Sequence, residues 1–308
     1  MNITIIGAGG VGGYFGGILA KAGNNVTFIA RGQHLDAIKR HGLRVKHHAG
    51  DFTVQVSATD NPVQATPSDL VLFTVKGYDT QSAVPVLKAL VGKNTNVLTL
   101  QNGVESYQIL GDAVGRARVL PGAAYIESRI DSPGVIQQTG PNCRIVFGEA
   151  DGSRTPRAQS IHKAFLDAGI KCEISDDVMK VLWTKFVFIA PVAGLTTACR
   201  TRMLHLLDQP DYRDALVSAM REVEAVARAH NVRLDPDVVD KTMAYVTNAV
   251  KDLTASMHLD LDRGRRLELE TLTGAVVRLG EAKGVPTPIN KLLYLILKPH
   301  MNGKSGRT

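Results

Sequence analysis

The chain has 308 residues, enough for two domains, and its composition of 44% hydrophobic and 21% charged residues is that of a soluble globular protein. Apolar runs such as residues 187–193 are far shorter than the ~18 residues that cross a bilayer, so no membrane partner is expected. The net charge of +7 would suit nucleic acid, but the densest basic cluster, at residues 263–266, is followed at once by Glu268 and Glu270, which is typical of a solvated helix face.

The N-terminal stretch "ITIIGAGG" has no basic region before it, and it resembles a strand and turn rather than a signal sequence. We therefore expect a cytoplasmic protein. The three cysteines, Cys143, Cys172 and Cys199, agree with this location because they are widely spaced and odd in number. We interpret them as buried small apolar residues.

The first half of the chain alternates short β-type apolar runs with helical patterns, which favours a mostly parallel sheet covered by helices. The helical patterns include residues 82–91 and 156–168, and residues 43–57 resemble an inserted hairpin. The expected strands are Ile3–Ile6, Val26–Ala30, Leu70–Val75, Val97–Leu100, Val119–Ala124, Ile145–Phe147 and Ile170–Ile174.

The strand pattern stops after about residue 176, and the rest of the chain is predicted to be helical. Leu216, Met220, Val223 and Val226 recur at intervals of three and four, which indicates one apolar helix face. The expected helices are Met179–Ala190, Asp211–His230, Pro236–Asp252, Arg265–Lys283 and Pro288–Lys298. We therefore predict a Rossmann-type α/β domain over residues 1–175 and an all-α domain over residues 176–308.

The glycine-rich stretch after the first strand fits the dinucleotide-binding pattern Gly-X-Gly-X-X-Gly. In this pattern Gly7 makes the tight turn, Gly9 lets the backbone approach a pyrophosphate, and Gly12 lets the helix pack on the strand. The N-terminus of the following helix offers free N–H groups to the phosphates. A glycine turn without a ligand is the alternative. The predicted phosphate loop therefore consists of Gly7, Ala8, Gly9, Gly10, Val11 and Gly12.

The second strand is followed by Arg31, 19 residues after Gly12. An NAD site usually places an acidic residue there to accept a hydrogen bond from the ribose 2′-hydroxyl. A guanidinium cannot accept that bond, but it can pair with a 2′-phosphate. Arg31 therefore favours NADP(H) over NAD(H), the alternative being a surface arginine at the end of a strand.

Two neighbouring strands end on polar residues, at the sheet edge where ligands bind in α/β proteins. "LVLFTVKGYD" supplies Lys76, and "NVLTLQNGVE" supplies Gln101, Asn102 and Gly103. Surface lysines are common, and Asn-Gly is often only a turn. Their joint position nevertheless makes both candidates for contact with a ligand.

Three residues of the helical half are candidates for the chemistry. Lys185 lies among apolar residues in "VLWTKF", where a lowered pKa would allow proton transfer, although its head could also reach water. Ser256 and Glu268 would lie ~18 Å apart on a single helix. We expect Asp262 to cap a helix that carries Glu268, and Ser256 to lie on the preceding loop, where its hydroxyl could bind a carboxylate. No metal-ligand spacing is present, so no metal is expected.

Taken together, these stretches resemble the ketopantoate reductase (2-dehydropantoate 2-reductase) family over nearly the whole chain. The matching segments are "IIGAGGVGGYFGG", "FIARG", "TVKGYDT", "LQNGVES", "VLWTKF" and "ASMHLDLDRGRRLELETLTG". The resemblance implies a helical domain similar to that of 6-phosphogluconate dehydrogenases. It also implies reduction of ketopantoate by NADPH on the route to pantothenate and coenzyme A, and it leaves a homodimer open.

The resemblance also assigns roles to individual residues. It implies that Lys185 is the proton donor and that Lys185, Asn102 and Ser256 contact the substrate. It implies cofactor contacts from residues 7–12, and from Arg31, Lys76, Asn102 and Glu268. The family commonly has asparagines four and eight residues after its lysine, whereas this chain has Ile189 and Ala193. A site without the amide should discriminate less well for a substrate hydroxyl.

The sequence thus predicts an NADPH-dependent reductase of a small 2-oxo acid, with ketopantoate as the leading substrate. Ile189 motivates a related reductase of another 2-oxo acid as the alternative. A regulator that senses NADP(H) without turning over a substrate is the alternative from another class. The presence of Lys185, Ser256 and Glu268 argues against the hypothesis of a regulator without catalytic activity.

Overall fold

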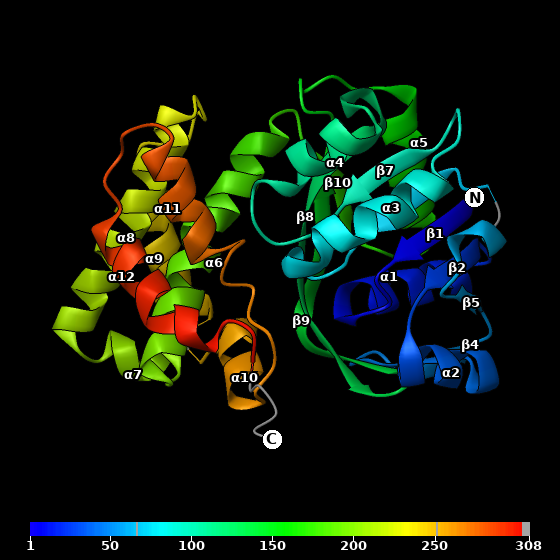
Figure 1. Ribbon diagram of the computed structural model, residues 1–308, viewed down its shortest axis with the longest axis horizontal. Helices are drawn as coiled ribbons and strands as arrows, with labels where there is room; N and C mark the ends of the chain where they lie inside the picture. Colours follow the sequence, from blue (N-terminus) through cyan, green and yellow to red (C-terminus); the bar gives the residue numbers. More distant parts are fainter. Residues whose placement is uncertain (66, 251, 304–308) are drawn as a thin grey trace. The chain divides into compact units, whose positions relative to one another are not determined.

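The computed structural model describes residues 1–65, 67–250 and 252–303. Its internal contacts divide the chain into two compact units (Figure 1). Unit 1 comprises residues 1–101 and 106–178, and unit 2 comprises residues 102–105 together with the described residues from 179 onward. The sequence placed the division near residue 175 and gave no sign that residues 102–105 belong with the helical half.

Unit 1 contains a ten-stranded mixed sheet with the order β4-β3-β9-β8-β7-β6-β1-β2-β5, in which β10 also pairs with β9. The strands are β1 (Asn2–Ile6), β2 (Asn25–Ile29), β3 (Leu43–Lys46), β4 (Phe52–Val54), β5 (Ser57–Thr59), β6 (Leu70–Phe73), β7 (Asn96–Thr99), β8 (Val119–Ser132), β9 (Val135–Phe147) and β10 (Cys172–Ile174). The helices are α1 (Gly10–Lys21), α2 (Gly32–His41), α3 (Thr80–Leu90), α4 (Ser106–Val114) and α5 (Pro156–Asp167), with 3-10 turns η1 (Pro62–Gln64), η2 (Gly77–Asp79) and η3 (Arg116–Arg118).

The parallel strands are apolar on both faces because each face is covered by helices. Ile3 and Ile5 of β1 join a core that contains residues of α1, α2 and α5, whereas Ile6 joins a second core with α3 and α4. Strand β6 alternates in the same way, with Leu70 and Leu72 in the first core and Val71 and Phe73 in the second. This two-sided burial is the pattern that a parallel sheet requires, and the predicted fold class is confirmed for this unit.

The sheet is mostly parallel, as the sequence predicted, but it contains two antiparallel strand pairs. Strands β8 and β9 form one long antiparallel hairpin, drawn in green in Figure 1. The predicted strands 119–124 and 145–147 are only its buried ends, because the outer part of β8 is largely exposed and has no continuous apolar run. The expected hairpin at residues 43–57 is present as the antiparallel pair β3 and β4, and β5 pairs instead in parallel with β2.

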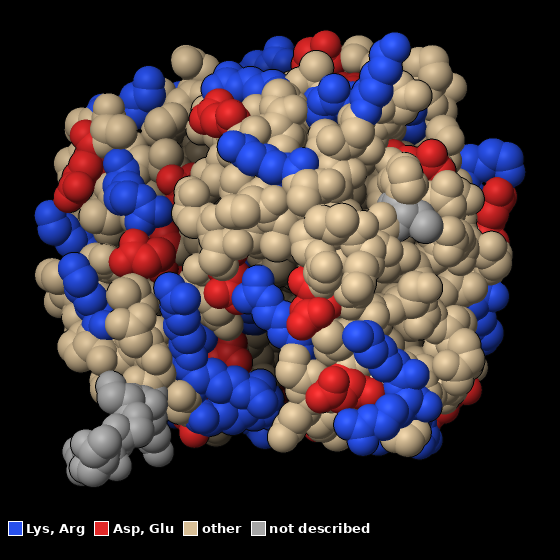
Figure 2. Space-filling view, turned by 45° about the vertical axis from the view of Figure 1, so that its right-hand side comes forward, with Lys and Arg blue, Asp and Glu red and all other residues tan. Residues whose placement is uncertain are grey.

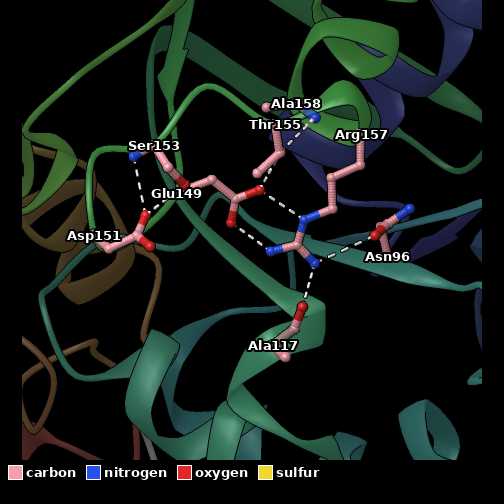
Figure 3. A network of polar contacts seen from close by, with 8 residues as sticks. All are labelled: Asn96, Ala117, Glu149, Asp151, Ser153, Thr155, Arg157 and Ala158. Carbon is pink, nitrogen blue, oxygen red and sulfur yellow. Dashed lines mark hydrogen bonds and ion pairs between the residues drawn. The ribbon is translucent and has the colours of Figure 1, made fainter.

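An ion pair between a buried carboxylate and a half-buried guanidinium fixes the segment between β9 and α5 (Figure 3). The Arg157 guanidinium, at the start of α5, donates two hydrogen bonds to the Glu149 carboxylate and one to the Ala117 carbonyl. Thr155 caps α5 and donates to the same carboxylate. Burial alone would raise the pKa of Glu149, but Arg157 and Thr155 hold it below its usual range. The pair therefore joins three segments of unit 1.

We expect Arg157→Met to lower the free energy of unfolding by about 3 kcal/mol, because it leaves the Glu149 charge buried without its partner. Arg116→Met, which removes an exposed arginine from a pair with Asp112, is the matched control and should change little. Urea unfolding of the two variants measures the difference. Equal midpoints in both variants would show that the pair contributes nothing to stability.

The stabilisation by Glu149 depends on pH, because folding depresses the pKa of its carboxyl group. Its contribution to the free energy of unfolding is complete above the unfolded pKa and is lost as the pH falls through the folded pKa.

All the regular secondary structure in the described residues of unit 2 is helical. Its helices are α6 (Val178–Cys199, whose first residue is assigned to unit 1), α7 (Met203–Leu207), α8 (Pro210–Ala229), α9 (Val238–Ala249), α10 (Ser256–Asp262), α11 (Thr273–Glu281) and α12 (Pro288–Leu297), followed by the 3-10 turn η4 (Lys298–His300). Helix α8 packs against α7, α9, α11 and α12. The apolar face predicted for α8 is buried, as Leu216, Met220, Val223 and Val226 show.

Helix α6 is longer than predicted because it continues through Pro191 to Cys199. Its length and composition would allow it to cross a membrane, but most of it is buried inside the protein. The core helix of a globular protein passes the same test, so this helix is weak evidence for a membrane span.

The predicted helix over residues 265–283 is wrong in its first half. Residues 256–262 form the short helix α10, and α11 begins only at Thr273. The intervening segment does not continue a helix, because Leu267 and Leu269 are buried and the Leu267 N–H donates to the Met301 carbonyl. Glu268 therefore lies on a buried non-helical segment, Ser256 begins a helix instead of lying on a loop, and Asp262 ends that helix instead of capping the next one.

The charged surface shows no large patch of one sign on the face drawn in Figure 2, where lysine and arginine are interspersed with aspartate and glutamate. Such mixing is typical of an ordinary solvated surface. The positive net charge is therefore not gathered into one patch on that face.

Candidate active site

The predicted phosphate loop connects β1 to α1 in unit 1, and two of its glycines are sterically required there. Gly7 has a φ of +99°, a conformation that favours glycine. A Cβ atom on Gly12 would lie 2.2 Å from the Gly7 carbonyl oxygen and 2.3 Å from Thr74 Oγ1. Gly12 thus allows α1 to approach the end of β1 as closely as the dinucleotide-binding pattern requires.

Gly9 has a different environment from its neighbours. It is the N-cap of α1, and a Cβ atom placed on it would meet no atom of the protein within 4 Å. Packing inside unit 1 therefore does not require glycine at this position. The open space beside a helix N-terminus is what the close approach of a pyrophosphate would need. On the opposite side, Gly10 faces the Ser128 carbonyl oxygen, from which a Cβ would be 2.3 Å away.

Two side chains that the sequence analysis missed hold this loop. Thr74 Oγ1 donates to the Ile6 and Gly7 carbonyls at 3.1 and 2.8 Å. The imidazole of His34, on α2, bonds the Ala8 carbonyl through Nε2 at 2.8 Å and accepts from the Gly134 N–H through Nδ1 at 3.0 Å. Since Nδ1 accepts, Nε2 must be the donor. The signal in the sequence was only a histidine three residues after Arg31, which no pattern links to the loop.

Arg31 is the exposed N-cap of α2 and follows directly after β2 and Ala30. Since β1 and β2 are parallel, Arg31 and the glycine loop lie at the same edge of the sheet. A guanidinium next to a helix N-terminus makes this edge suitable for phosphate. Unit 1 thus places the loop and Arg31 at the same edge of the sheet.

The end of β6 also contributes to this edge. Lys76 is half-buried and precedes the turn η2. Gln101, which follows β7, has a structural role, because its Nε2 donates to the Val75 carbonyl at 2.9 Å and to Thr80 Oγ1 at 2.8 Å. Gln101 therefore fixes the strand ends, while Lys76 remains a candidate for ligand contact.

The Asn-Gly pair after β7 is both a turn and part of a side-chain cluster in unit 2. Gly103 has a φ of +98°, and a Cβ on it would lie 2.8 Å from the Thr271 carbonyl oxygen. Glu105 pairs with Arg278 at 2.8 Å. These contacts attach residues 102–105 to the segment around α11. They place Asn102 where its Oδ1 accepts a hydrogen bond of 3.0 Å from Lys185 Nζ.

Lys185 is the centre of this cluster. Lys185 belongs to α6, and its sequence neighbours Trp183 and Phe186 are both buried. Burial lowers the pKa of the Lys185 ammonium from 10.5 to about 8, and the negative charge of nearby Glu268 opposes that shift. Glu268 is only 5% exposed. The structure therefore joins Lys185, Asn102 and Glu268, which lie far apart in the sequence.

Ser256 is not part of the hydrogen bonds of this cluster. It is exposed at the start of α10, and its hydroxyl has no hydrogen-bond partner among the residues that the structure describes. Ile189 and Ala193 follow Lys185 on α6 at intervals of four, so the three lie along one side of the helix. Ile189 is half-buried and Ala193 is buried.

An ammonium with a pKa near 8 can be protonated at neutral pH and still release its proton to a strong base. Asn102 holds the ammonium in one position, and the Glu268 carboxylate stabilises its charged form. This combination suits a reaction in which an oxygen atom gains negative charge. The glycine loop of unit 1, residues 7–12, contains no ionisable side chain.

Comparisons with known proteins find similarity over nearly the whole chain. Residues 3–152 match the family model described as "Ketopantoate reductase PanE/ApbA", and residues 177–301 match the model of its C-terminal domain. The chain is 30% identical over 298 residues to a 2-dehydropantoate 2-reductase of Archaeoglobus fulgidus, covering 96% of this chain and 97% of that protein. It is 29% identical over 300 residues to the uncharacterized oxidoreductase YkpB of Bacillus subtilis, covering 97% and 98%.

Solved structures show the same similarity. A PanE/ApbA family ketopantoate reductase from Ralstonia eutropha has a TM-score of 0.91 at 34% identity, with 98% of each chain covered. A 2-dehydropantoate 2-reductase from Geobacter metallireducens has a TM-score of 0.91 at 30% identity, with 97% of this chain and 99% of that one covered.

Proposed function

The chain belongs to the ketopantoate reductase PanE/ApbA family, and from this premise we propose that it reduces ketopantoate to pantoate with NADPH, with Lys185 as the proton donor. The observation that carries this proposal is the hydrogen bond between Lys185 and Asn102 beside the buried charge of Glu268. Oxidoreductase chemistry is common to the family. The cofactor, the substrate and the residue roles given below are our proposals.

Residues of unit 1 fit a dinucleotide. The loop from Gly7 to Gly12 and the N-terminus of α1 would hold the pyrophosphate, and the space beside Gly9 supports this assignment. Arg31 would pair with a 2′-phosphate, and Lys76 and Asn102 would contact the bound cofactor. When bound, the cofactor supplies the hydride that reduces the ketone carbon.

Residues of unit 2 would complete the reduction. Lys185 donates its proton to the oxygen of the ketone as that oxygen becomes an alkoxide, and the ammonium becomes a neutral amine. Asn102 keeps Nζ in position, and Glu268 keeps the lysine charged until the proton is needed. Ser256 would bind the substrate carboxylate, and Glu268 would also reach the cofactor. The gain of one hydride and one proton turns the 2-oxo acid into a 2-hydroxy acid.

We expect NADPH to bind more tightly than NADH, since Arg31 can pair with the extra phosphate. Arg31→Ala should raise the Kd for NADPH by about 10- to 100-fold and leave the Kd for NADH nearly unchanged. Arg40→Ala, an exposed arginine at the other end of α2, is the control and should affect neither. Fluorescence titration with both cofactors measures these constants. Equal affinity of the unaltered protein for NADPH and NADH would refute the assignment of Arg31.

The alternative substrate, another 2-oxo acid, is favoured by Ile189, which lies one turn from Lys185 on α6. An apolar side chain there cannot bond a substrate hydroxyl. We expect the preference in kcat/KM for ketopantoate over 3,3-dimethyl-2-oxobutanoate, which lacks the hydroxyl, to stay well below ~10⁴, and Ile189→Asn to increase it. A preference of ~10⁴ in the unaltered protein would contradict this, and Asn102 would become the candidate partner of the hydroxyl.

Steady-state oxidation of NADPH with ketopantoate tests the proposed function as a whole. Turnover that requires both compounds supports it. Tight binding of NADPH without turnover of any 2-oxo acid would instead support the alternative of an NADP(H)-sensing regulator. We also propose that the protein acts in the cytoplasm, on the route to pantothenate and coenzyme A, with residues 1–175 binding the cofactor and residues 176–308 contributing substrate contacts and a homodimer interface.

A further inference from the structure

Unit 1 contains a second pocket that the proposed reaction does not use. It has a volume of about 460 Å³ and lies between α1 from Tyr14 onward, the segment joining β3 to β4, strand β9 and the turn between α5 and β10. Its lining includes aromatic and aliphatic side chains, mainly Tyr14, Phe15, Ile18, Phe52 and Ile170. A pocket of this volume is large enough for a small organic molecule, and its lining combines apolar and polar side chains.

The polar groups of the pocket are basic or neutral. Lys21 and Lys171 line it together with His47 and His48, and no carboxylate is among the lining residues. Asp51, whose negative charge acts on His47, is itself paired with Arg44 at 3.1 Å. The pocket therefore favours an anion, because two lysines face it without a lining acid to neutralise them.

The aromatic groups of the pocket suit a flat apolar body. Tyr14 and His47 meet edge to face with ring centres 5.8 Å apart, and Lys21 Nζ lies 4.5 Å from the centre of the Phe52 ring. Tyr14 is 4% exposed, and its hydroxyl lies near the half-buried thiol of Cys143. Burial raises the pKa of Cys143 to about 11, so this thiol adds no negative charge at neutral pH.

The pocket is separate from the phosphate loop. The α1 residues that line the pocket begin at Tyr14, and no residue from Gly7 to Gly12 lines it. None of the residues proposed to bind the cofactor or the substrate lines it. A ligand there would be additional to both.

We propose that this pocket binds a small organic anion that joins one carboxylate to a flat apolar body of about two fused rings. The rings pack against Tyr14, Phe52 and Ile18, and the carboxylate pairs with Lys21 and Lys171 at the rim. This site does not depend on the reaction that the protein catalyses.

The test is a ¹⁹F NMR titration of the full chain, saturated with NADP⁺, with 6-fluoro-2-naphthoate. We expect saturable binding with a Kd of about 1 mM or below. The double variant Lys21→Gln with Lys171→Gln should raise that Kd at least about tenfold. The matched double variant Lys88→Gln with Lys93→Gln, which removes two exposed lysines elsewhere in unit 1, should leave it unchanged.

Three results would each overturn the proposal. An unchanged Kd in the Lys21 and Lys171 variant would show that the lysines do not bind the anion. Equal affinity for the uncharged 6-fluoro-2-naphthamide would show that the site does not select a charge. Loss of binding in Lys185→Met would show that the probe occupies the proposed substrate site instead.

Discussion

Lys185→Arg is expected to lower kcat by about 100-fold or more and to change the KM for the 2-oxo acid far less. Arginine keeps the positive charge that attracts a carboxylate, but its pKa is too high for it to release a proton readily. General acid catalysis is worth about 10²- to 10⁴-fold, so its loss should appear in kcat. If Lys185 only bound the substrate, the arginine variant would retain most of its turnover.

The pH dependence provides a second readout of the same residue. Because the pKa of Lys185 is about 8, the protonated form that donates is lost above that pH, and the rate should fall there. This decline should be absent from the residual activity of Lys185→Arg. Lys180→Arg, a lysine in the same helix that pairs with Asp235, is the control and should keep both kcat and the decline. Near-normal turnover in Lys185→Arg would make Lys76 the candidate acid.

Substitution of two glycines of the phosphate loop by alanine is expected to separate cofactor binding from stability, because one variant should lose affinity and the other should lose stability. Gly9→Ala should leave the unfolding midpoint nearly unchanged, since its Cβ meets no protein atom, but it should weaken NADPH binding by about 100-fold or more by blocking the pyrophosphate. Gly12→Ala should destabilise the fold by several kcal/mol, because its Cβ would collide with the backbone at Gly7.

Thermal unfolding and cofactor titration of the two variants separate these effects. An intact Kd for NADPH in Gly9→Ala would show that the cofactor does not approach the loop at this point. A stable Gly12→Ala protein would show that α1 can move away from β1 without cost. Gly23→Ala cannot serve as a control for Gly9→Ala. Gly23 has a φ of +87°, which would strain an alanine, whereas Gly9 has a φ of −75°.

Much of the fold could be predicted from the sequence because it depends on local patterns. The buried parallel strands are continuous apolar runs, and the glycine loop follows β1 at fixed spacing. The outer part of the β8–β9 hairpin was missed because its exposed residues lack such a run. The loop before α11 was predicted as helix because its leucines and charges fit a helical pattern, whereas the structure buries Leu267, Glu268 and Leu269 in an irregular segment.

The candidate site was predictable where it depends on motifs and not where it depends on contacts. Lys185 and Asn102 were proposed separately, and only the fold shows that they share a hydrogen bond. The role of His34 could not be predicted, because it depends on a hydrogen bond from Gly134, which lies 100 residues later in the sequence. Ser256 was expected to bind the substrate carboxylate, and this role stays a prediction.

The most direct test of the central claim is to follow the hydride. The protein is incubated with ketopantoate and NADPH carrying deuterium at both C4 positions of the nicotinamide, and the product is analysed by mass spectrometry and NMR. We predict pantoate that carries one deuterium on its C2 carbon, formed in step with the oxidation of the cofactor. Oxidation of the cofactor without deuterium on C2, or no product from ketopantoate and other 2-oxo acids, would contradict the account.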